Sequence, residues 1–119
     1  MSIAHVLSVL PVSDIDRSRA WYERLFGRGP DNTPMPPLAE WHLTEGGWVQ
    51  VWVDPGRAGS GLLNLAVDDL PAHLDGLRAA GLEPGDIQEV NRGVTLAPIS
   101  DPDGNVVTLI GSFRVEYGT

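Results

Sequence analysis

Residues 48–53 place aromatic and amide side chains at alternate positions of a predicted strand. Trp48, Gln50 and Trp52 alternate there with three valines. Successive side chains of a strand point to opposite faces of its sheet, so we expect the valines in the core and the other three on the opposite face. Two indoles beside an amide suit the binding of a flat organic molecule. The alternative is that the tryptophans fill the interior or a contact between two copies.

The other residues capable of chemistry lack the spacing of a catalytic site. His5, His42 and His73 form no H-x-H or H-x-x-x-H pattern. Asp101 and Asp103 flank a turn, and turn formation accounts for both without acid–base catalysis. Because the chain has no cysteine, thiol catalysis, zinc–thiolate sites and disulfides are excluded.

Composition restricts the class of protein and its partners. The 119 residues are enough for one domain, which we expect to span 1–119. Sixteen acidic and eight basic residues give a net charge of −8, which argues against nucleic acid and anionic membranes as partners. No apolar run approaches the roughly 20 residues of a membrane span, and no basic region precedes the first apolar stretch. We therefore expect a cytoplasmic protein.

The first half of the chain supplies the elements that must position these side chains. Turn residues and apolar spacing predict, in order, a strand over 3–12, a helix that begins at the capping sequence Ser13–Asp16 and ends at Gly27, a loop or poor edge strand over 29–37, and strands over 41–44 and 48–53. The direction of Trp41, a further candidate aromatic wall, stays open.

The second half repeats this pattern after a flexible linker over 54–61. It predicts a strand over 62–67, a helix from Asp69 to Gly81, a weak strand over 87–90, strands over 94–99 and 105–110 around an Asp103-Gly104 turn, and a tail strand over 113–117. Val12-x-Asp14-Ile15 matches Val67-x-Asp69-Leu70 at an offset of 69 − 14 = 55 residues, which indicates an internal duplication. We place the two modules at about 1–55 and 61–119.

Two motifs at this separation resemble the vicinal oxygen chelate superfamily, which includes glyoxalases, extradiol dioxygenases and bleomycin-resistance proteins. They are residues 12–18 running into Trp21-Tyr22 and Leu25-Phe26-Gly27, and Asp101–Asn105 running into 106–110. The resemblance implies an α+β fold of two βαβββ modules, which form a curved mixed sheet with a concave cleft and outer helices. It also implies a homodimer.

The same resemblance places the family's metal-ligand positions at Leu7, Gln50, Leu62 and Thr108. Two of these side chains are aliphatic and have no donor atom, and the other two are uncharged polar groups. A divalent metal held by a protein needs three or four good donors. We therefore expect no metal and no other cofactor. The alternative is a divalent metal held by His5 and Gln50 with help from a partner chain.

These observations favour a metal-free protein that binds a drug-like small molecule, as bleomycin-resistance proteins do. The negative charge favours a cationic aromatic ligand. No residue is predicted to be catalytic, and the predicted ligand-binding residues are Trp48, Gln50, Trp52, Leu7, Leu62, Asn64 and Thr108. The alternative function is a divergent metal-dependent lyase, isomerase or dioxygenase of the same superfamily.

Overall fold

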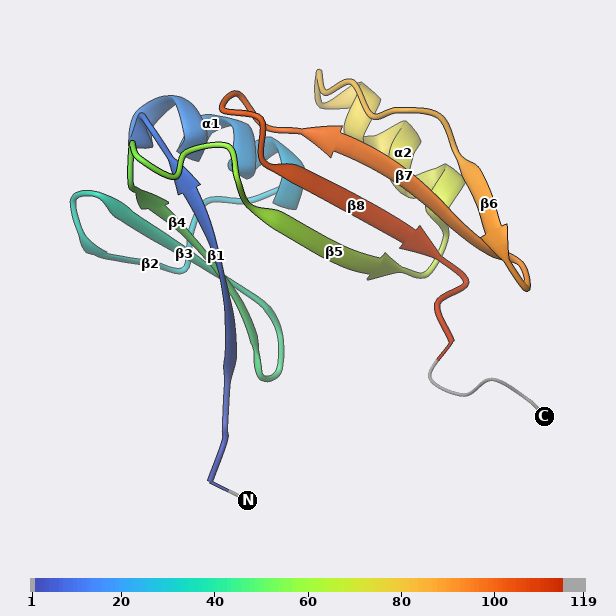
Figure 1. The fold of residues 1–119 in the computed structure, drawn as a ribbon, viewed down its shortest axis with the longest axis horizontal. Coiled ribbons are helices and arrows are strands. Elements are labelled where there is room, and N and C mark those ends of the chain that lie inside the picture. Colours follow the sequence, from blue (N-terminus) through green and yellow to red (C-terminus); the bar gives the residue numbers. More distant parts are fainter. Residues whose placement is uncertain (1, 115–119) are drawn as a thin grey trace.

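The computed structural model describes residues 2–114 as two modules, each with four strands and one helix (Figure 1). The first module contains β1 (Val6–Val12), α1 (Ile15–Phe26), β2 (Asn32–Met35), β3 (Leu38–Thr44) and β4 (Gly47–Val53). The second contains β5 (Leu62–Val67), α2 (Leu70–Ala79), β6 (Gln88–Asn91), β7 (Val94–Ser100) and β8 (Val106–Gly111). The predicted α+β class and the two βαβββ modules are confirmed.

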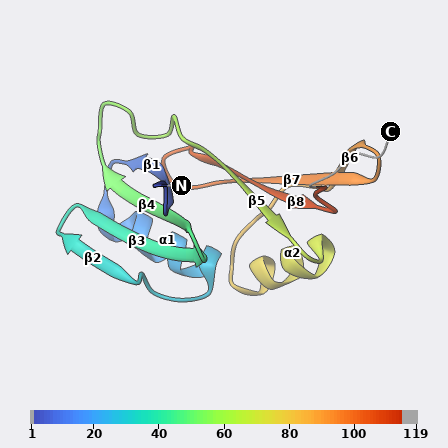
Figure 2. The same ribbon diagram turned by 90° about the horizontal axis from the view of Figure 1, so that it is seen from below.

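Both modules form a four-stranded mixed sheet with the same connectivity. The strand orders are β1-β4-β3-β2 and β5-β8-β7-β6. In each sheet the first and last strands of the module pair in parallel and the remaining pairs are antiparallel. The modules lie side by side, with β1 and β5 in contact at the seam between them (Figures 1 and 2). This repeated topology agrees with the duplication seen in the sequence.

The residue that caps helix α1 is one position after Ser13, the first residue of the predicted capping sequence. The N-cap is Asp14, whose side chain accepts a hydrogen bond from the Arg17 N–H at 3.0 Å. Ser13 instead donates its backbone N–H to Asp103 in the second module at 3.0 Å. The predicted end at Gly27 is confirmed, since this residue has a φ of 75° that an L side chain rarely adopts.

Helix α2 begins and ends as the sequence predicted. Asp69 is its N-cap and accepts from the Ala72 N–H at 3.0 Å, with Pro71 in the first turn. The helix is followed by Gly81 with a φ of 88°. Leu74 and its neighbours on the apolar stripe are buried against the second sheet.

Several strand boundaries differ from those predicted. Strand β1 begins at Val6 rather than at residue 3, and β3 begins at Leu38 rather than at residue 41. The proline-rich segment contains an exposed edge strand over 32–35, where a missing N–H is tolerated. Of the predicted tail strand, residues 113–114 lie outside any strand. Residues 115–119 lie outside the described part of the chain.

The valine row of β4 forms part of the core beneath α1. Val49 and Val51 are 2% and 0% exposed, and they pack in one cluster with Tyr22 and Trp41. Trp41 is itself 0% exposed, and its indole N–H donates to the Arg28 carbonyl at 3.0 Å. It is therefore a core residue and not an aromatic wall of the open face, because its position in β3 lies opposite Val49.

The Asp101–Asn105 turn joins the two modules through buried hydrogen bonds. One carboxylate oxygen of Asp101 accepts the backbone N–H groups of residues 103, 104 and 105, each at 2.9 Å. The other accepts the hydroxyl of Tyr22 on α1 at 2.7 Å. Asn105 donates to the Pro11 carbonyl of β1 at 2.7 Å. The turn therefore fixes the second module against the first.

Asp103 adds a second link on the outer side of the same turn. Its carboxylate accepts the backbone N–H and hydroxyl of Ser13 and lies 3.4 Å from the guanidinium of Arg17. Gly59 of the linker approaches the turn so closely that a Cβ there would lie 2.2 Å from the Asp103 carbonyl oxygen. Both acids therefore have the structural role that the turn sequence indicated.

Candidate functional site

Each sheet has one face covered by its helix and one face that is not, here called the open face. On the first sheet the open face carries the tryptophan–glutamine row of β4. By register, Trp48 lies beside Leu7 and His42, Gln50 beside Val9 and Glu40, and Trp52 beside Pro11 and Leu38. The three predicted binding residues of β4 are each partly exposed. They thus share one surface, opposite the buried valines.

Trp48 is held in place by two histidines. The His42 ring stacks on the indole with centroids 4.3 Å apart and planes inclined by 16°. The indole N–H donates to Nδ1 of His5 at 3.1 Å. A neutral His5 therefore carries its proton on Nε2, because Nδ1 acts as the acceptor. The sequence offered no partner for His42, because the pairing of β3 with β4 brings it beside Trp48. His5 precedes β1, which pairs with the other side of β4.

His42 is positioned by an acid on the β2 side of the sheet. Its backbone N–H donates to Asp31 at 2.7 Å, and the same carboxylate oxygen accepts from Arg28 at 2.7 Å. The His42 N–H, followed by the Arg28 hydrogen bond, lowers the pKa of Asp31. The His42 ring nitrogen Nε2 lies 2.8 Å from the Glu45 carbonyl. These bonds fix the ring that covers one face of Trp48.

The sequence analysis missed a carboxylate at the centre of this face. Gln50 donates its side-chain amide to Glu40 at 2.5 Å, and Asn32 lies 3.4 Å from the second carboxylate oxygen. Glu40 faces the ligand side because it is opposite Gln50 in the ladder. The expected start of β3 at residue 41 left Glu40 outside the strand. The apolar pair Leu38-Ala39 before it was the signal that could have extended the strand.

The second sheet offers a smaller set of polar side chains. Asn64 lies directly opposite Thr108, and Leu62 opposite Val106. Leu62 is 80% exposed and Leu7, its equivalent on β1, is 47% exposed. In each module the first-strand leucine is diagonal to the last-strand polar residue, Gln50 or Thr108. The duplication therefore places the four family metal positions equivalently on the two open faces.

The side chains at those four positions do not fit a divalent metal. They provide one amide and one hydroxyl, and the two leucines provide no donor atom. Within residues 2–114, no three His, Cys, Asp or Glu side chains are grouped so that they could hold an ion. His5, the alternative donor, accepts the Trp48 N–H through Nδ1. The positions that the family resemblance assigns to metal ligands therefore offer too few donors for a divalent ion.

The seven predicted binding residues do not line one cavity of the single chain. Trp48 and Asn64 line a cavity of about 300 Å³ between the first module and β5. Trp52 lines a different one of about 480 Å³ with Asp54 and Arg57. The other four, Leu7, Gln50, Leu62 and Thr108, line neither. The open faces are shallow surfaces joined at the seam, and the predicted site is divided between them.

Comparison with protein families identifies the class to which this architecture belongs. The sequence profile of the glyoxalase-like domain matches residues 7–110. The chain is therefore a member of the glyoxalase-like family, within the vicinal oxygen chelate superfamily. Comparison with curated protein sequences finds no match. Neither helix described in residues 2–114 combines the length and the apolar character needed to cross a bilayer.

Solved structures with the same fold include proteins that bind antibiotics. A glyoxalase/bleomycin resistance protein from Catenulispora acidiphila is 29% identical, with a TM-score of 0.85 over 92% of this chain and 98% of that one. An antibiotic-binding protein from a Streptomyces species is 25% identical, with a TM-score of 0.75 over 93% and 98%. A bleomycin-binding protein in complex with bleomycin is 25% identical, with a TM-score of 0.74 over 92% and 98%.

Proposed function

We propose that this protein binds a flat, cationic organic molecule on the open face of its first sheet. The observation that supports this most strongly is the carboxylate of Glu40, which lies opposite Gln50 in the row between Trp48 and Trp52. A carboxylate attracts a cation, and indole faces bind both aromatic rings and cationic groups. The net charge of −8 adds a field that attracts cations over longer distances.

Two of the similar structures support the proposal of ligand binding. One is a bleomycin-binding protein complexed with bleomycin, and another is an antibiotic-binding protein. Sequestration of a drug-like molecule requires only burial, stacking and hydrogen bonds, and the open face offers groups for each of them. We therefore propose sequestration of the ligand without its chemical conversion.

The proposed binding needs no metal ion or other cofactor. The four positions that the family resemblance assigns to metal ligands hold two leucines, an amide and a hydroxyl. The amide of Gln50 is already hydrogen-bonded to Glu40, and that pair presents a negative charge to the ligand directly.

A second copy of this chain is proposed to complete the site. Leu7, Val9 and Leu62 are 47%, 51% and 80% exposed and lie on β1 and β5 at the seam. A dimer that covers these leucines and this valine would remove apolar surface from water and close the shallow open faces. We expect a dimer by sedimentation velocity and a monomer for Leu62→Glu.

The matched control for the dimer is Val90→Glu, which adds the same charge at a 53% exposed valine on edge strand β6. This variant should stay dimeric. Circular dichroism should show both variants folded, because neither side chain is buried. A monomeric wild-type protein at all concentrations, or dissociation by both variants alike, contradicts the proposed interface.

The cation site is tested by calorimetric titration in EDTA with N-methylquinolinium and with its neutral isostere 1-methylnaphthalene. We expect the wild type to prefer the cation, and Glu40→Gln to lose about five- to tenfold in affinity for the cation alone. The control Glu89→Gln removes an exposed carboxylate from β6 and should change nothing. Equal cation affinity in the wild type and Glu40→Gln contradicts the proposal, and binding abolished by EDTA favours the metal-dependent alternative.

A further inference from the structure

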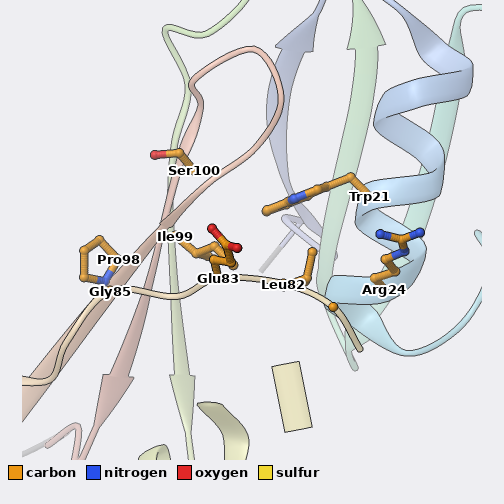
Figure 3. A pocket seen from close by; sticks show the side chains of 9 residues that line it. Trp21, Arg24, Leu82, Glu83, Gly85, Pro98, Ile99 and Ser100 are labelled. Atoms are coloured by element: carbon orange, nitrogen blue, oxygen red, sulfur yellow. The ribbon is translucent and has the colours of Figure 1, made fainter. Parts of the chain in front are cut away.

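A second concave region lies on the helix side of the molecule, away from both open faces. It has a volume of about 490 Å³ and is bounded by α1, the loop after α2, and the end of β7 (Figure 3). Trp21 and Arg24 line it from α1, where a spacing of three residues puts them on one side of the helix. The buried side chains of Leu82 and Ile99, 5% and 4% exposed, form its apolar base.

Arg24 differs from the other arginines described in residues 2–114. All eight basic residues of the chain are arginines. Five of them form ion pairs with nearby acids, namely Arg17, Arg19, Arg28, Arg57 and Arg78. Arg114 donates to the carbonyl of Arg92, which has an interaction of its own. The side chain of Arg24 has no hydrogen bond or ion pair with any described residue. In a chain with twice as many acids as bases, this leaves one guanidinium available to an external anion.

Glu83 provides an opposite charge across the same cavity. In Figure 3 Glu83 lies on the strand side of the cavity, Arg24 lies on the helix at the other side, and the ring of Trp21 extends from the helix toward the strands. Glu83 forms no ion pair or hydrogen bond with a described residue, so the two charges are not neutralised by each other. A separated cation and anion above an apolar base match a molecule that carries both charges.

The geometry points to a binding site for a free amino acid with a large apolar or aromatic side chain. A guanidinium binds a carboxylate through two parallel hydrogen bonds, so we assign the ligand carboxylate to Arg24. The ligand ammonium is assigned to Glu83, and its side chain to the surface formed by Trp21, Leu82 and Ile99. A ligand this small in an open cavity binds in the millimolar range. This site is independent of the function proposed for the open face.

The probe is L-phenylalanine, with phenylacetate and phenethylamine as analogues that each lack one charge. The readout is the indole ¹⁵N–¹H resonance of Trp21, assigned with the Trp21→Phe variant. We expect saturable shifts of this resonance with phenylalanine and weaker binding of both analogues. Arg24→Gln should weaken phenylalanine and phenylacetate at least about tenfold and leave phenethylamine unchanged. Glu83→Gln should weaken phenylalanine and phenethylamine and leave phenylacetate unchanged.

Arg19→Gln is the matched control, because it removes a guanidinium from the exposed side of the same helix that is paired with Glu23. It should leave phenylalanine binding as in the wild type. The inference is overturned if phenylalanine does not move the Trp21 resonance, or if Arg24→Gln binds as tightly as Arg19→Gln. Binding of N-methylquinolinium to the open face should be the same in all these variants, so the two proposals fail separately.

Discussion

Removing the hydroxyl of Tyr22 tests the joint between the two modules. The side chain is 0% exposed, and its hydroxyl donates to Asp101 at 2.7 Å. Tyr22→Phe keeps the ring and its packing against Trp41 and Phe26 but leaves one carboxylate oxygen with a single donor, Asn105. A hydrogen bond to a charged acceptor contributes about 1.5–3 kcal/mol. We therefore expect a loss of about 2 kcal/mol in the free energy of unfolding.

Urea denaturation followed by circular dichroism measures this change. A loss of about 2 kcal/mol corresponds to a melting temperature lower by roughly 6–12 °C in a domain of this size. The dependence of the free energy on urea should stay the same, because the surface exposed on unfolding does not change. Tyr22→Phe, Asp101→Asn and the double variant together give the coupling between the two side chains. A Tyr22→Phe protein within about 0.5 kcal/mol of the wild type would refute the assigned role of this bond.

The same hydroxyl predicts how stability depends on pH. Burial, and then the nearby charge of Asp101, raises the pKa of Tyr22 above its ordinary value of 10.0. Below pH 10 both the folded and the unfolded forms keep this proton, so Tyr22 contributes no pH dependence to the free energy of unfolding there. Above pH 10 the unfolded tyrosine ionises and the folded one does not, so stability falls as pH rises. This loss should be smaller in Tyr22→Phe.

Other substitutions test separate parts of the structure. Gly59→Ala should destabilise by more than about 2 kcal/mol in thermal denaturation, because φ is 87° and the added Cβ would meet the Asp103 carbonyl at 2.2 Å. Gly56→Ala, where the Cβ would have ordinary contacts, is its control. Asp14→Ala should cost about 1 kcal/mol through loss of the α1 cap, measured by urea denaturation. His5→Ala should shift the Trp48 indole N–H resonance and leave stability nearly unchanged, since His5 is exposed.

Most helices and strands could be predicted because hydrophobic alternation and helix-ending glycines act over a few neighbouring residues. The two-residue alternation of residues 48–53 predicted its three valines in the core. The structure buries Val49 and Val51, and Val53 is partly buried against the same cluster. Gly27 and Gly81 end helices as expected, because each adopts a positive φ. The duplication at an offset of 55 residues predicted the matching topology of the two sheets.

The features that depend on pairing between distant segments could not be predicted in the same way. Glu40 reaches the open face through the register of β3 on β4, and Trp41 enters the core for the same reason. Asp101 was correctly assigned to a turn, but its bond to Tyr22 crosses between modules and has no local signal. The cavity at Trp21 likewise exists only because the modules are fixed together there.

The most direct test of the proposed function is an indole ¹⁵N–¹H titration of the wild-type protein with N-methylquinolinium in EDTA. The four tryptophans report on different places: Trp48 and Trp52 on the open face, Trp21 on the helix side, and Trp41 in the core. We predict saturable shifts of the Trp48 and Trp52 resonances while those of Trp21 and Trp41 stay in place. Shifts confined to Trp21, or no shift without added metal, would contradict a metal-free cation site on the first sheet.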